Sequence, residues 1–237
     1  MLCVITKAVI LAAGKGTRMG EITKLLPKHL IEVNNRPFLY YVIQNLKDIG
    51  LTDLCIVVHY KKEHIEAFVK EHSIKATLID QGEPLGTAHA IKCTKDFVGN
   101  DNFIVVMGDN YYSGEDIKKM LIDDNYCYVA GMKHSCPEKY GVIVKKDDFL
   151  IRMPEKPKEF VSDLINIAMY KFTPEIFDVI DKIKRSVRGE YEINDAIMLL
   201  ANRKKVKVIE IINDWIDLGC PEDIPKAEEF FKTHLKC

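Results

Sequence analysis

The chain has 237 residues, of which 47% are hydrophobic and 29% charged, which is the composition of a soluble globular protein. The formal net charge is −1, so no overall electrostatic attraction favours a nucleic acid or an anionic membrane as a partner, and we expect neither. The longest apolar runs are far shorter than the roughly 20 residues that span a membrane, and the first residues lack the basic segment of a signal peptide.

The chain contains seven cysteines, an odd number, and none of them forms a Cys-x-x-Cys pair. This spacing argues against a disulfide framework and against a zinc site, and it favours reduced thiols with mostly structural roles. We therefore expect a cytoplasmic localisation. The seven are Cys3, Cys55, Cys93, Cys127, Cys136, Cys220 and Cys237.

In the first 110 residues, segments typical of strands alternate with segments typical of helices. Such alternation predicts a doubly wound α/β fold with a largely parallel sheet. Pro37 suits the first position of a helix, and Gly50 suits its carboxyl-terminal cap. The predicted strands are Ala8 to Leu11, Leu54 to Val58, Ala76 to Ile79 and Phe103 to Met107, and the predicted helices are Pro37 to Ile49, Lys62 to Glu71 and one from about Thr87.

The second half of the chain is richer in strands. Ser113 and Asp116 are spaced as a capping box for a helix that precedes this region. No repeat, low-complexity tract or linker interrupts the pattern, so we predict one continuous domain over residues 1–237. The expected elements are the strands "CYVAGMK", "YGVIVKK", "FLIRM" and "LINIAMYKF", helices from Thr173 to about Lys184 and from Ile193 to Ala201, a strand from Val206 to Ile211, and a helix from Pro221.

The stretch "AVILAAGKGTRMG" joins the first strand to a glycine-rich, basic loop. Gly14 and Gly16 match the start of a dinucleotide-binding fingerprint, but Met19 stands where its third glycine belongs, and Gly20 follows one residue late. No helix is predicted directly after the loop, and no Walker A string occurs in the chain. Both standard nucleotide-binding loops are therefore excluded.

Two cations follow these glycines and point to an anionic ligand. The glycines let the backbone approach a ligand closely, Arg18 lies just beyond them, and Lys28 follows Pro27 ten residues later. Two cations beside a glycine-lined site suit a triphosphate that gains charge in its transition state. The alternative is a polar loop whose cations are simply solvated.

Two aspartates follow apolar segments that are far apart in the chain. Asp109 follows the strand Phe103 to Met107, and ligands of open α/β folds bind at the carboxyl edge of the sheet. Asp217 lies in "WIDLG", again after an apolar stretch. Two such carboxylates suit Mg²⁺, which takes few protein ligands besides phosphate oxygens and water. The alternative for Asp109 is a helix-capping role.

The motifs taken together resemble those of the sugar-1-phosphate nucleotidyltransferases. "LAAGKGTRMGEITKLLPKHLIEV" is similar to the signature of that family, L-A-A-G-x-G-T-R-(M/L) followed by P-K. The similarity continues through "QGEPLGTAHAI", "VVMGDN", "YGVI", "EKP", "NIAMY", "GEYEINDAI" and "WIDLGCPED". These motifs follow one another in the family's order along nearly the whole chain.

The resemblance implies a three-layer α/β/α Rossmann-like fold with a mixed, mainly parallel sheet and strand-rich sugar-binding insertions in the second half. Residues 1–110 would bind the nucleotide and residues 111–237 the sugar phosphate, with no appended hexapeptide-repeat domain. The resemblance implies nucleotide contacts for Leu11, Ala12, Ala13, Gly14, Gly16, Thr17, Gln81, Gly86 and Thr87, sugar-phosphate contacts for Gly108, Gly141, Glu155 and Asn166, catalytic roles for Arg18, Lys28 and Lys156, and Mg²⁺ ligation by Asp109 and Asp217.

The implied reaction is attack by a sugar-1-phosphate on the α-phosphate of a nucleoside triphosphate, which gives an NDP-sugar and pyrophosphate. Gln81 would read the edge of a uracil or thymine, so UTP or dTTP is the expected nucleotide, with glucose-1-phosphate or N-acetylglucosamine-1-phosphate as the sugar. Two departures from the family pattern are Gly20-Glu21, where a proline is common, and Ile165, where a serine usually precedes the asparagine. A homo-oligomer is compatible with the sequence.

Three alternatives remain open at this stage. A guanylyltransferase that uses GTP and mannose-1-phosphate has a similar P-x-G-T-A segment. A non-catalytic regulatory relative would keep the fold but lose the cations or the metal-binding aspartates. A dehydrogenase would need an acidic residue at the end of the second strand, where His59 stands instead. Glu190 and Glu192 receive no role beyond structural support or indirect positioning.

Overall fold

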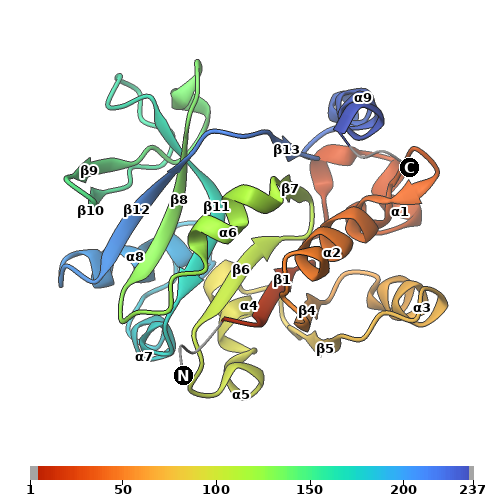
Figure 1. Cartoon of the computed structure of the whole chain (residues 1–237), viewed down its shortest axis with the longest axis horizontal. Coiled ribbons are helices and arrows are strands. Elements are labelled where there is room, and N and C mark those ends of the chain that lie inside the picture. The colour runs from red at the N-terminus through yellow and green to blue at the C-terminus, as the bar shows by residue number, and fades with distance from the viewer. Residues whose placement is uncertain (1–4, 235–237) are drawn as a thin grey trace.

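A nine-stranded mixed sheet forms the centre of the molecule in the computed structural model, which describes residues 5–234 (Figure 1). The strand order is β5-β4-β1-β6-β11-β8-β12-β10-β9. In that order the strands are β5 (Thr77–Asp80), β4 (Asp53–Val58), β1 (Lys7–Leu11), β6 (Phe103–Met107), β11 (Leu164–Phe172), β8 (Cys127–Lys133), β12 (Val206–Ile211), β10 (Phe149–Arg152) and β9 (Val144–Lys146).

The sheet changes character at β11. Strands β5, β4, β1 and β6 are parallel, as the alternating pattern of the first 110 residues predicts. Strand β11 is antiparallel to both of its neighbours, β8 and β12 are parallel to each other, and β10 and β9 run as an antiparallel edge. The predicted α/β fold with a mixed, mainly parallel sheet is therefore confirmed.

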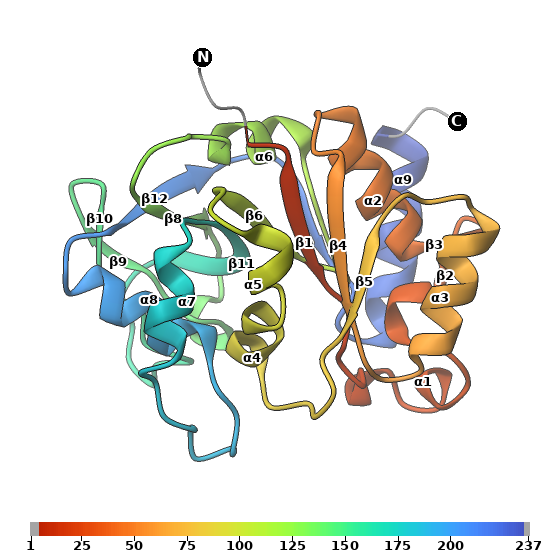
Figure 2. The same ribbon diagram turned by 90° about the horizontal axis from the view of Figure 1, so that it is seen from below.

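Helices cover both faces of the sheet and make the three predicted layers. Ala8 and Ile10 of β1 belong to one apolar core and Val9 and Leu11 to the other, because successive side chains of a strand point to opposite faces. Figure 2 shows the two helical layers on either side of β1 and β4. The first core is covered by α2 (Phe38–Asp48), α3 (Lys62–Glu71), α6 (Gly114–Met120) and α9 (Ile224–His234), and the second by α4 (Thr87–Lys92), α5 (Lys95–Val98), α7 (Glu175–Ile180) and α8 (Ile193–Ala201).

The predicted elements are present, and the differences lie at their ends and in short segments that the prediction does not include. No helix is predicted between the glycine loop and Pro37, but residues 17–30 contain two 3₁₀ turns, Thr17–Met19 and Lys28–Leu30, and the short helix α1 (Ile22–Leu25). Pro37 precedes helix α2 rather than beginning it, because it closes the small hairpin of β2 (Glu32–Val33) and β3 (Arg36–Pro37). Helix α7 ends at Ile180 instead of near Lys184, and a 3₁₀ turn, Pro221–Asp223, precedes α9.

The predicted capping box of helix α6 is wrong in one of its two parts. The Ser113 hydroxyl caps the helix by accepting from the Glu115 amide (3.3 Å). The Asp116 carboxylate is instead fully buried and accepts from the backbone and side-chain amides of Asn213, both at 3.0 Å. A long-range contact between α6 and the chain after β12 has therefore replaced the local one.

A second, two-stranded ladder lies beside the main sheet and joins distant parts of the chain. Strand β7 (Asn110–Tyr112) pairs antiparallel with β13 (Trp215–Asp217), so that Asn110 lies opposite Asp217 (Figure 1). The backbone amide of Leu218 also donates to the carbonyl oxygen of Asp109 (2.9 Å). This ladder was not predicted, because each of its strands has only three residues.

None of the helices within residues 5–234 is long and apolar enough to cross a membrane. The cysteines in that range, Cys55, Cys93, Cys127, Cys136 and Cys220, are all free, as predicted. Cys3 and Cys237 lie outside the described residues.

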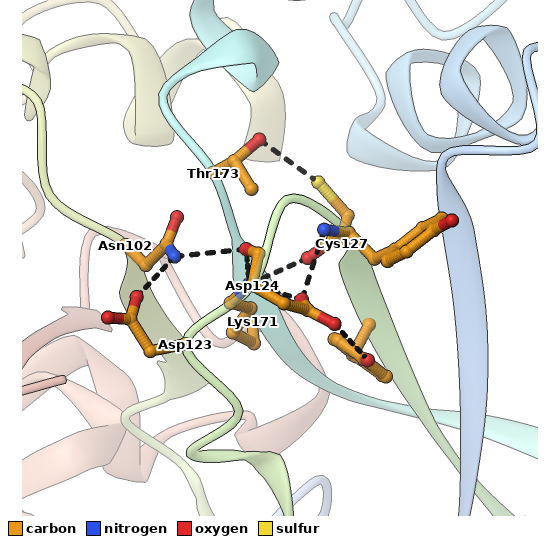
Figure 3. Close-up of polar contacts among 8 residues, drawn as sticks. Asn102, Asp123, Asp124, Cys127, Lys171 and Thr173 are labelled. Carbon is orange, nitrogen blue, oxygen red and sulfur yellow. Dashed lines mark hydrogen bonds and ion pairs between the residues drawn. The ribbon is translucent and has the colours of Figure 1, made fainter. Parts of the chain in front are cut away.

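A buried lysine stabilises the edge of the sheet opposite the ends of β1 and β6. Lys171 of β11 has a fully buried side chain, and its ammonium group donates to the carbonyl oxygens of Asp124 and Tyr126, both at 2.7 Å (Figure 3). It also forms an ion pair with the Asp124 carboxylate at 3.2 Å. Burial lowers the pKa of Lys171, and Asp124 opposes that shift. Lys171 thus links strand β11 to the loop that precedes β8.

We expect Lys171→Met to lower the free energy of unfolding by about 2 to 4 kcal/mol, because it removes a buried ammonium group that donates to two backbone carbonyls and pairs with a carboxylate. Urea unfolding followed by circular dichroism measures the change. The control is Lys146→Met on the exposed edge strand β9, which should change stability by no more than about 0.5 kcal/mol. Equal effects of the two substitutions would contradict this role of Lys171.

Candidate active site

The carboxyl ends of β1 and β6 open into a cavity of about 430 Å³. Leu11 and Met107 end these two strands, are paired in register, and line the cavity floor. The carboxyl edge of parallel strands is the usual ligand site of open α/β folds. The lining residues are Leu11, Ala13, Gly14, Lys15, Gly16, Thr17, Lys28, His29, Gln81, Pro84, Gly86, Thr87, Ala90, Met107, Asp109 and Glu190.

Gly16 brings Lys28 into this first cavity. Its backbone is left-handed (φ 65°), and a Cβ atom there would lie 3.0 Å from both Cβ and Cδ of Lys28. The Lys28 side chain therefore packs directly over the glycine. The Thr23 hydroxyl, which lies within bonding distance of the carbonyl oxygens of Gly16 (3.2 Å) and Gly20 (3.1 Å), closes the loop.

Gln81 and Gly86 form the opposite end of the first cavity. Gln81 is buried, and its Nε2 donates to the Gly86 carbonyl oxygen (3.0 Å). A Cβ atom on Gly86 would lie only 2.6 Å from the backbone oxygen of Tyr191, and its φ of +103° also favours glycine. The Tyr191 amide donates to the Leu85 carbonyl oxygen (2.7 Å), so the segment before α8 holds this loop.

A second cavity, of about 290 Å³, adjoins the first. Leu11, Thr87 and Met107 line both, so the two spaces share a wall at the ends of β1 and β6. The residues lining the second cavity are Leu11, Arg18, Thr87, Met107, Lys139, Tyr140, Gly141, Glu155, Lys156, Asn166, Ala168, Tyr170, Glu192, Ile193, Asn194 and Asp217.

A bulge in β11 shapes the second cavity. The register with β8 shifts between Asn166 and Tyr170, and Ala168 has a left-handed backbone (φ 57°). The Asn166 side chain donates to the Tyr170 hydroxyl (2.9 Å) and accepts from the Ala168 amide (2.9 Å). The bulge therefore fixes the orientation of the Asn166 amide at the cavity wall.

Gly141 and Glu155 face each other across an isolated β-bridge next to this bulge. A Cβ atom on Gly141 would lie 3.0 Å from Oε2 of Glu155, so the glycine leaves room for the carboxylate. The Lys156 amide donates to the Tyr140 carbonyl oxygen (3.0 Å), and Lys156 itself has a left-handed backbone (φ 44°). Distant segments therefore bring Glu155, Lys156 and Asn166 to one cavity.

Two carboxylates meet where the cavities adjoin. Asp109 lines the first cavity and is ion-paired with Lys28, and Asp217 lines the second. The Asn110 side-chain amide donates to Oδ1 of Asp109 (3.3 Å) and to Oδ1 of Asp217 (3.2 Å). The β7–β13 ladder thus positions the pair, although the two residues are separated by more than a hundred positions in sequence.

The electrostatics of the two carboxylates differ. Burial alone would raise the pKa of Asp109, but the positive charge of Lys28 brings it below its usual value. Burial and the neighbouring charge of Asp109 raise the pKa of Asp217 to about 6. Beneath them, burial and Lys28 lower the pKa of His29 to about 3, so its imidazole is neutral. At Asp109 the charge of Lys28 thus outweighs the effect of burial on the pKa, whereas at Asp217 the charges of Lys28 and Arg18 offset it only in part.

The carboxylate pair suits a divalent cation. Each carboxylate carries one oxygen that the Asn110 amide does not hold, and burial together with the nearby charge of Asp109 raises the pKa of Asp217 although Lys28 and Arg18 lower it. Oxygen donors of this kind are those that Mg²⁺ binds in proteins. Asp109 and Asp217 are thus the residues of this site that could hold such an ion.

Most residues selected from the sequence line one of the two cavities, with three differences. Arg18, expected beside Lys28, lies instead in the second cavity. Ala12 and Gly108 lie behind the wall: Ala12 is fully buried, and a Cβ atom on Gly108 would lie 3.0 Å from the His29 ring and 3.3 Å from Cβ of Ala12. They shape the cavity without facing it.

Sequence reasoning missed several residues that line the two cavities, and Asn110, which contacts both carboxylates without lining either cavity. Asn110 stands in the quoted "VVMGDN" motif, yet its contact with Asp217 depends on the unpredicted ladder. Glu190 and Glu192, left without a role, reach the first and second cavities respectively. The other residues not selected are Lys15, His29, Pro84, Ala90, Met107, Lys139, Tyr140, Ala168, Tyr170, Ile193 and Asn194.

Comparison with known proteins finds that the chain is similar to nucleotide-handling enzymes. Residues 7–234 match the family described as Nucleotidyl transferase. The chain is 38% identical over 225 residues to the bifunctional protein GlmU of Methanocaldococcus jannaschii. The match covers 94% of this chain and 53% of that protein. It thus spans about half the length of that relative and of several others that it matches.

A relative of similar length and a solved structure each match 94% of the chain. The UTP–glucose-1-phosphate uridylyltransferase AglF of Haloferax volcanii is 36% identical over 232 residues, with 94% of this chain and 95% of that protein covered. The crystal structure of a putative glucose-1-phosphate thymidylyltransferase from Bacillus anthracis, in complex with sucrose, matches with a TM-score of 0.83 at 29% identity and covers 94% of each chain.

We expect Asp217→Asn to stabilise the protein above pH 6 in the presence of a chelator. The pKa of Asp217 is raised in the folded state, so its stabilising contribution is present below about pH 4 and is lost as the pH rises through about 6. The ionised carboxylate then costs about 1 to 3 kcal/mol, which the amide avoids. Urea unfolding at pH 8 and at pH 4 measures the difference.

The control for this prediction is Asp214→Asn, which changes an exposed carboxylate three residues earlier and should alter stability little at either pH. The interpretation fails if Asp217→Asn is less stable than the wild type at pH 8.

Proposed function

The chain belongs to the nucleotidyl transferase family, and from that premise we propose that it is a sugar-1-phosphate nucleotidyltransferase. It would join a nucleoside triphosphate and a sugar-1-phosphate to give an NDP-sugar and pyrophosphate. The observation that carries the proposal is the pair of adjoining cavities, one glycine-lined and one polar, with a carboxylate pair at their junction.

The chemistry needs no protein nucleophile. A phosphate monoester is already anionic at neutral pH, so its oxygen can attack the α-phosphorus while the bond to the β-phosphate oxygen breaks and pyrophosphate leaves. Catalysis then consists of aligning two anions and stabilising the charge that develops between them. The shared wall of the two cavities would bring the reacting groups together.

Three cations would perform this stabilisation from different directions. Lys28 faces the first cavity and would hold the triphosphate beside Gly16. Lys156 lines the second cavity and would hold the sugar phosphate. Arg18 also lines the second cavity, where it would act between the two phosphates. We propose Mg²⁺ as the ion held by Asp109 and Asp217, where it would neutralise charge on both substrates.

Gln81 is the proposed determinant of the base. Its Nε2 donates to the Gly86 carbonyl oxygen and lies 3.3 Å from Nδ1 of His89, which can accept its second hydrogen, so its Oε1 is the arm left for a ligand and can only accept a hydrogen bond. Uracil and thymine present an N–H donor at N3, whereas cytosine presents an acceptor at N3 and has a donor only in its exocyclic amino group. This favours UTP or dTTP and disfavours CTP. Guanine also carries an N–H donor, which keeps the mannose-1-phosphate guanylyltransferase as the second candidate.

Glu155, Asn166 and the backbone of Gly141 are the proposed sugar contacts. They lie on one wall of the second cavity and offer acceptors and donors suited to sugar hydroxyls. The names of AglF and of the Bacillus anthracis protein both include glucose-1-phosphate, which supports that sugar for this chain. N-acetylglucosamine-1-phosphate remains the alternative.

We further propose that the protein is cytoplasmic and consists of one domain. Within it, residues 1–110 would bind the nucleotide and residues 111–237 the sugar phosphate. Apart from Glu190, the residues lining the first cavity precede residue 110, whereas most of those lining the second come from residues 111–237. Both cavities belong to the same sheet, so the halves would act as one unit. A regulatory relative without turnover is disfavoured because Arg18, Lys28, Asp109, Lys156 and Asp217 are all present.

A pyrophosphate-release screen tests the proposal. Five nucleoside triphosphates, UTP, dTTP, GTP, CTP and ATP, are combined with glucose-, N-acetylglucosamine- and mannose-1-phosphate in the presence of Mg²⁺. We expect release with UTP or dTTP and little with CTP, because Gln81 offers an acceptor. Silence across the whole panel would favour the regulatory alternative.

Two substitutions test the assigned chemistry. Arg18→Ala and Asp109→Ala should each lower turnover by about 10²-fold or more, because each removes a charge that acts on the reacting phosphates. Circular dichroism should show an intact fold in both. The matched control is Lys24→Ala, an exposed cation on α1 that pairs only locally with Glu21 and should leave turnover unchanged. Near-normal rates in both variants would contradict the assignment.

A further inference from the structure

Asn110 is buried between the two carboxylates, and the proposed chemistry so far gives it no role. It is the first residue of β7, lies opposite Asp217 in the ladder, and is 6% exposed. Its Nδ2 donates to Oδ1 of Asp109 at 3.3 Å and to Oδ1 of Asp217 at 3.2 Å. One uncharged amide therefore touches both members of a like-charged pair.

The orientation of this amide is fixed from its other side. The indole Nε1 of Trp215 donates to Oδ1 of Asn110 at 2.6 Å. A flipped amide would present its NH₂ group to the indole N–H and its oxygen to two carboxylates, so every contact would become unfavourable. Trp215 in turn packs edge-on against Tyr140 of the second cavity, with ring centroids 5.9 Å apart.

The contacts divide the four carboxylate oxygens into two sets. Both Oδ1 atoms face Asn110. Oδ2 of Asp109 faces the Lys28 ammonium group, and Oδ2 of Asp217 lies over Gly219, 3.3 Å from where a Cβ atom would be. The guanidinium nitrogens of Arg18 lie 3.4 Å from that same point. The Oδ2 atoms are thus the pair turned towards the cations of the site.

We propose that Asn110 is a positioning residue that holds Asp109 and Asp217 as one divalent-cation site, with Trp215 setting the orientation of its amide. The inference rests on the proposed function, because it takes the two aspartates as the ligands. An uncharged donor suits this position: it restrains both carboxylates without neutralising either, so their charge stays available to a metal ion.

Other side chains of similar shape could not hold both carboxylates at this position. An aspartate would add a third negative charge next to two others and would offer no donor. A leucine has the same branching but no donor, so it would leave both Oδ1 atoms without this hydrogen bond in a buried place. Removing a partner of this kind that orients metal ligands typically weakens metal binding by about 10- to 100-fold.

The test is Mn²⁺ binding without substrates, followed by the electron paramagnetic resonance signal of the free ion. We expect Asn110→Leu to raise the Kd for Mn²⁺ by at least about 10-fold relative to the wild type. Trp215→Phe, which removes only the indole N–H and keeps an aromatic ring, should raise it by a smaller factor. It also serves as the informative variant if Asn110→Leu does not fold.

The matched control is Asn45→Leu. The Asn45 side chain donates to the Tyr112 carbonyl oxygen (2.8 Å), so it supports the same strand β7 from helix α2 without touching either carboxylate. We expect its loss to lower stability while leaving the Kd for Mn²⁺ unchanged. An effect of Asn45→Leu as large as that of Asn110→Leu would reduce Asn110 to a structural residue and overturn the inference.

Two further outcomes separate this inference from the proposed function. If the wild type binds Mn²⁺ and both Asn110→Leu and Trp215→Phe bind it equally well, the inference is wrong while the metal assignment stands. If neither the wild type nor Asn45→Leu binds Mn²⁺, the metal assignment itself fails, and the inference fails with it.

Discussion

The arrangement of the molecule depends on keeping two buried carboxylates close together. Asp109 and Asp217 repel each other, and burial strengthens that repulsion, as the raised pKa of Asp217 shows. The β7–β13 ladder fixes both backbones, Lys28 forms an ion pair with Asp109, and Asn110 holds an oxygen of each carboxylate.

Strands β1, β6 and β11 of the main sheet position the residues around this carboxylate pair. The parallel strands β1 and β6 deliver Leu11, Met107 and Asp109 to one edge of the sheet, and the antiparallel β11 contributes Asn166 through its bulge. At the opposite edge, Lys171 fastens the loop before β8 and keeps β11 in place. The polar site at one edge and the buried ion pair at the other thus act on the same strand.

The sequence predicts what local pattern controls. The boundaries of α3, β6 and β12 follow from apolar periodicity, and the residues of the glycine loop follow from a resemblance to known motifs. Arg18 was expected beside Lys28 because the two are close in sequence, but the 3₁₀ turn Thr17–Met19 places Arg18 in the second cavity. Short turns and three-residue strands form through long-range contacts, which no local pattern records, so the ladder and Asn110 could not be predicted.

The balance of charge around the cavities argues for a cation that accompanies the substrates. The first cavity is lined by two cations, Lys15 and Lys28, and by two carboxylates, Asp109 and Glu190. The second is lined by three cations, Arg18, Lys139 and Lys156, and by three carboxylates, Glu155, Glu192 and Asp217. Each cavity is thus close to neutral, in keeping with a net charge of −1 for the chain. Phosphorylated ligands bring several negative charges, which these side chains cannot offset alone, and the carboxylate pair gives the missing positive charge a place to bind.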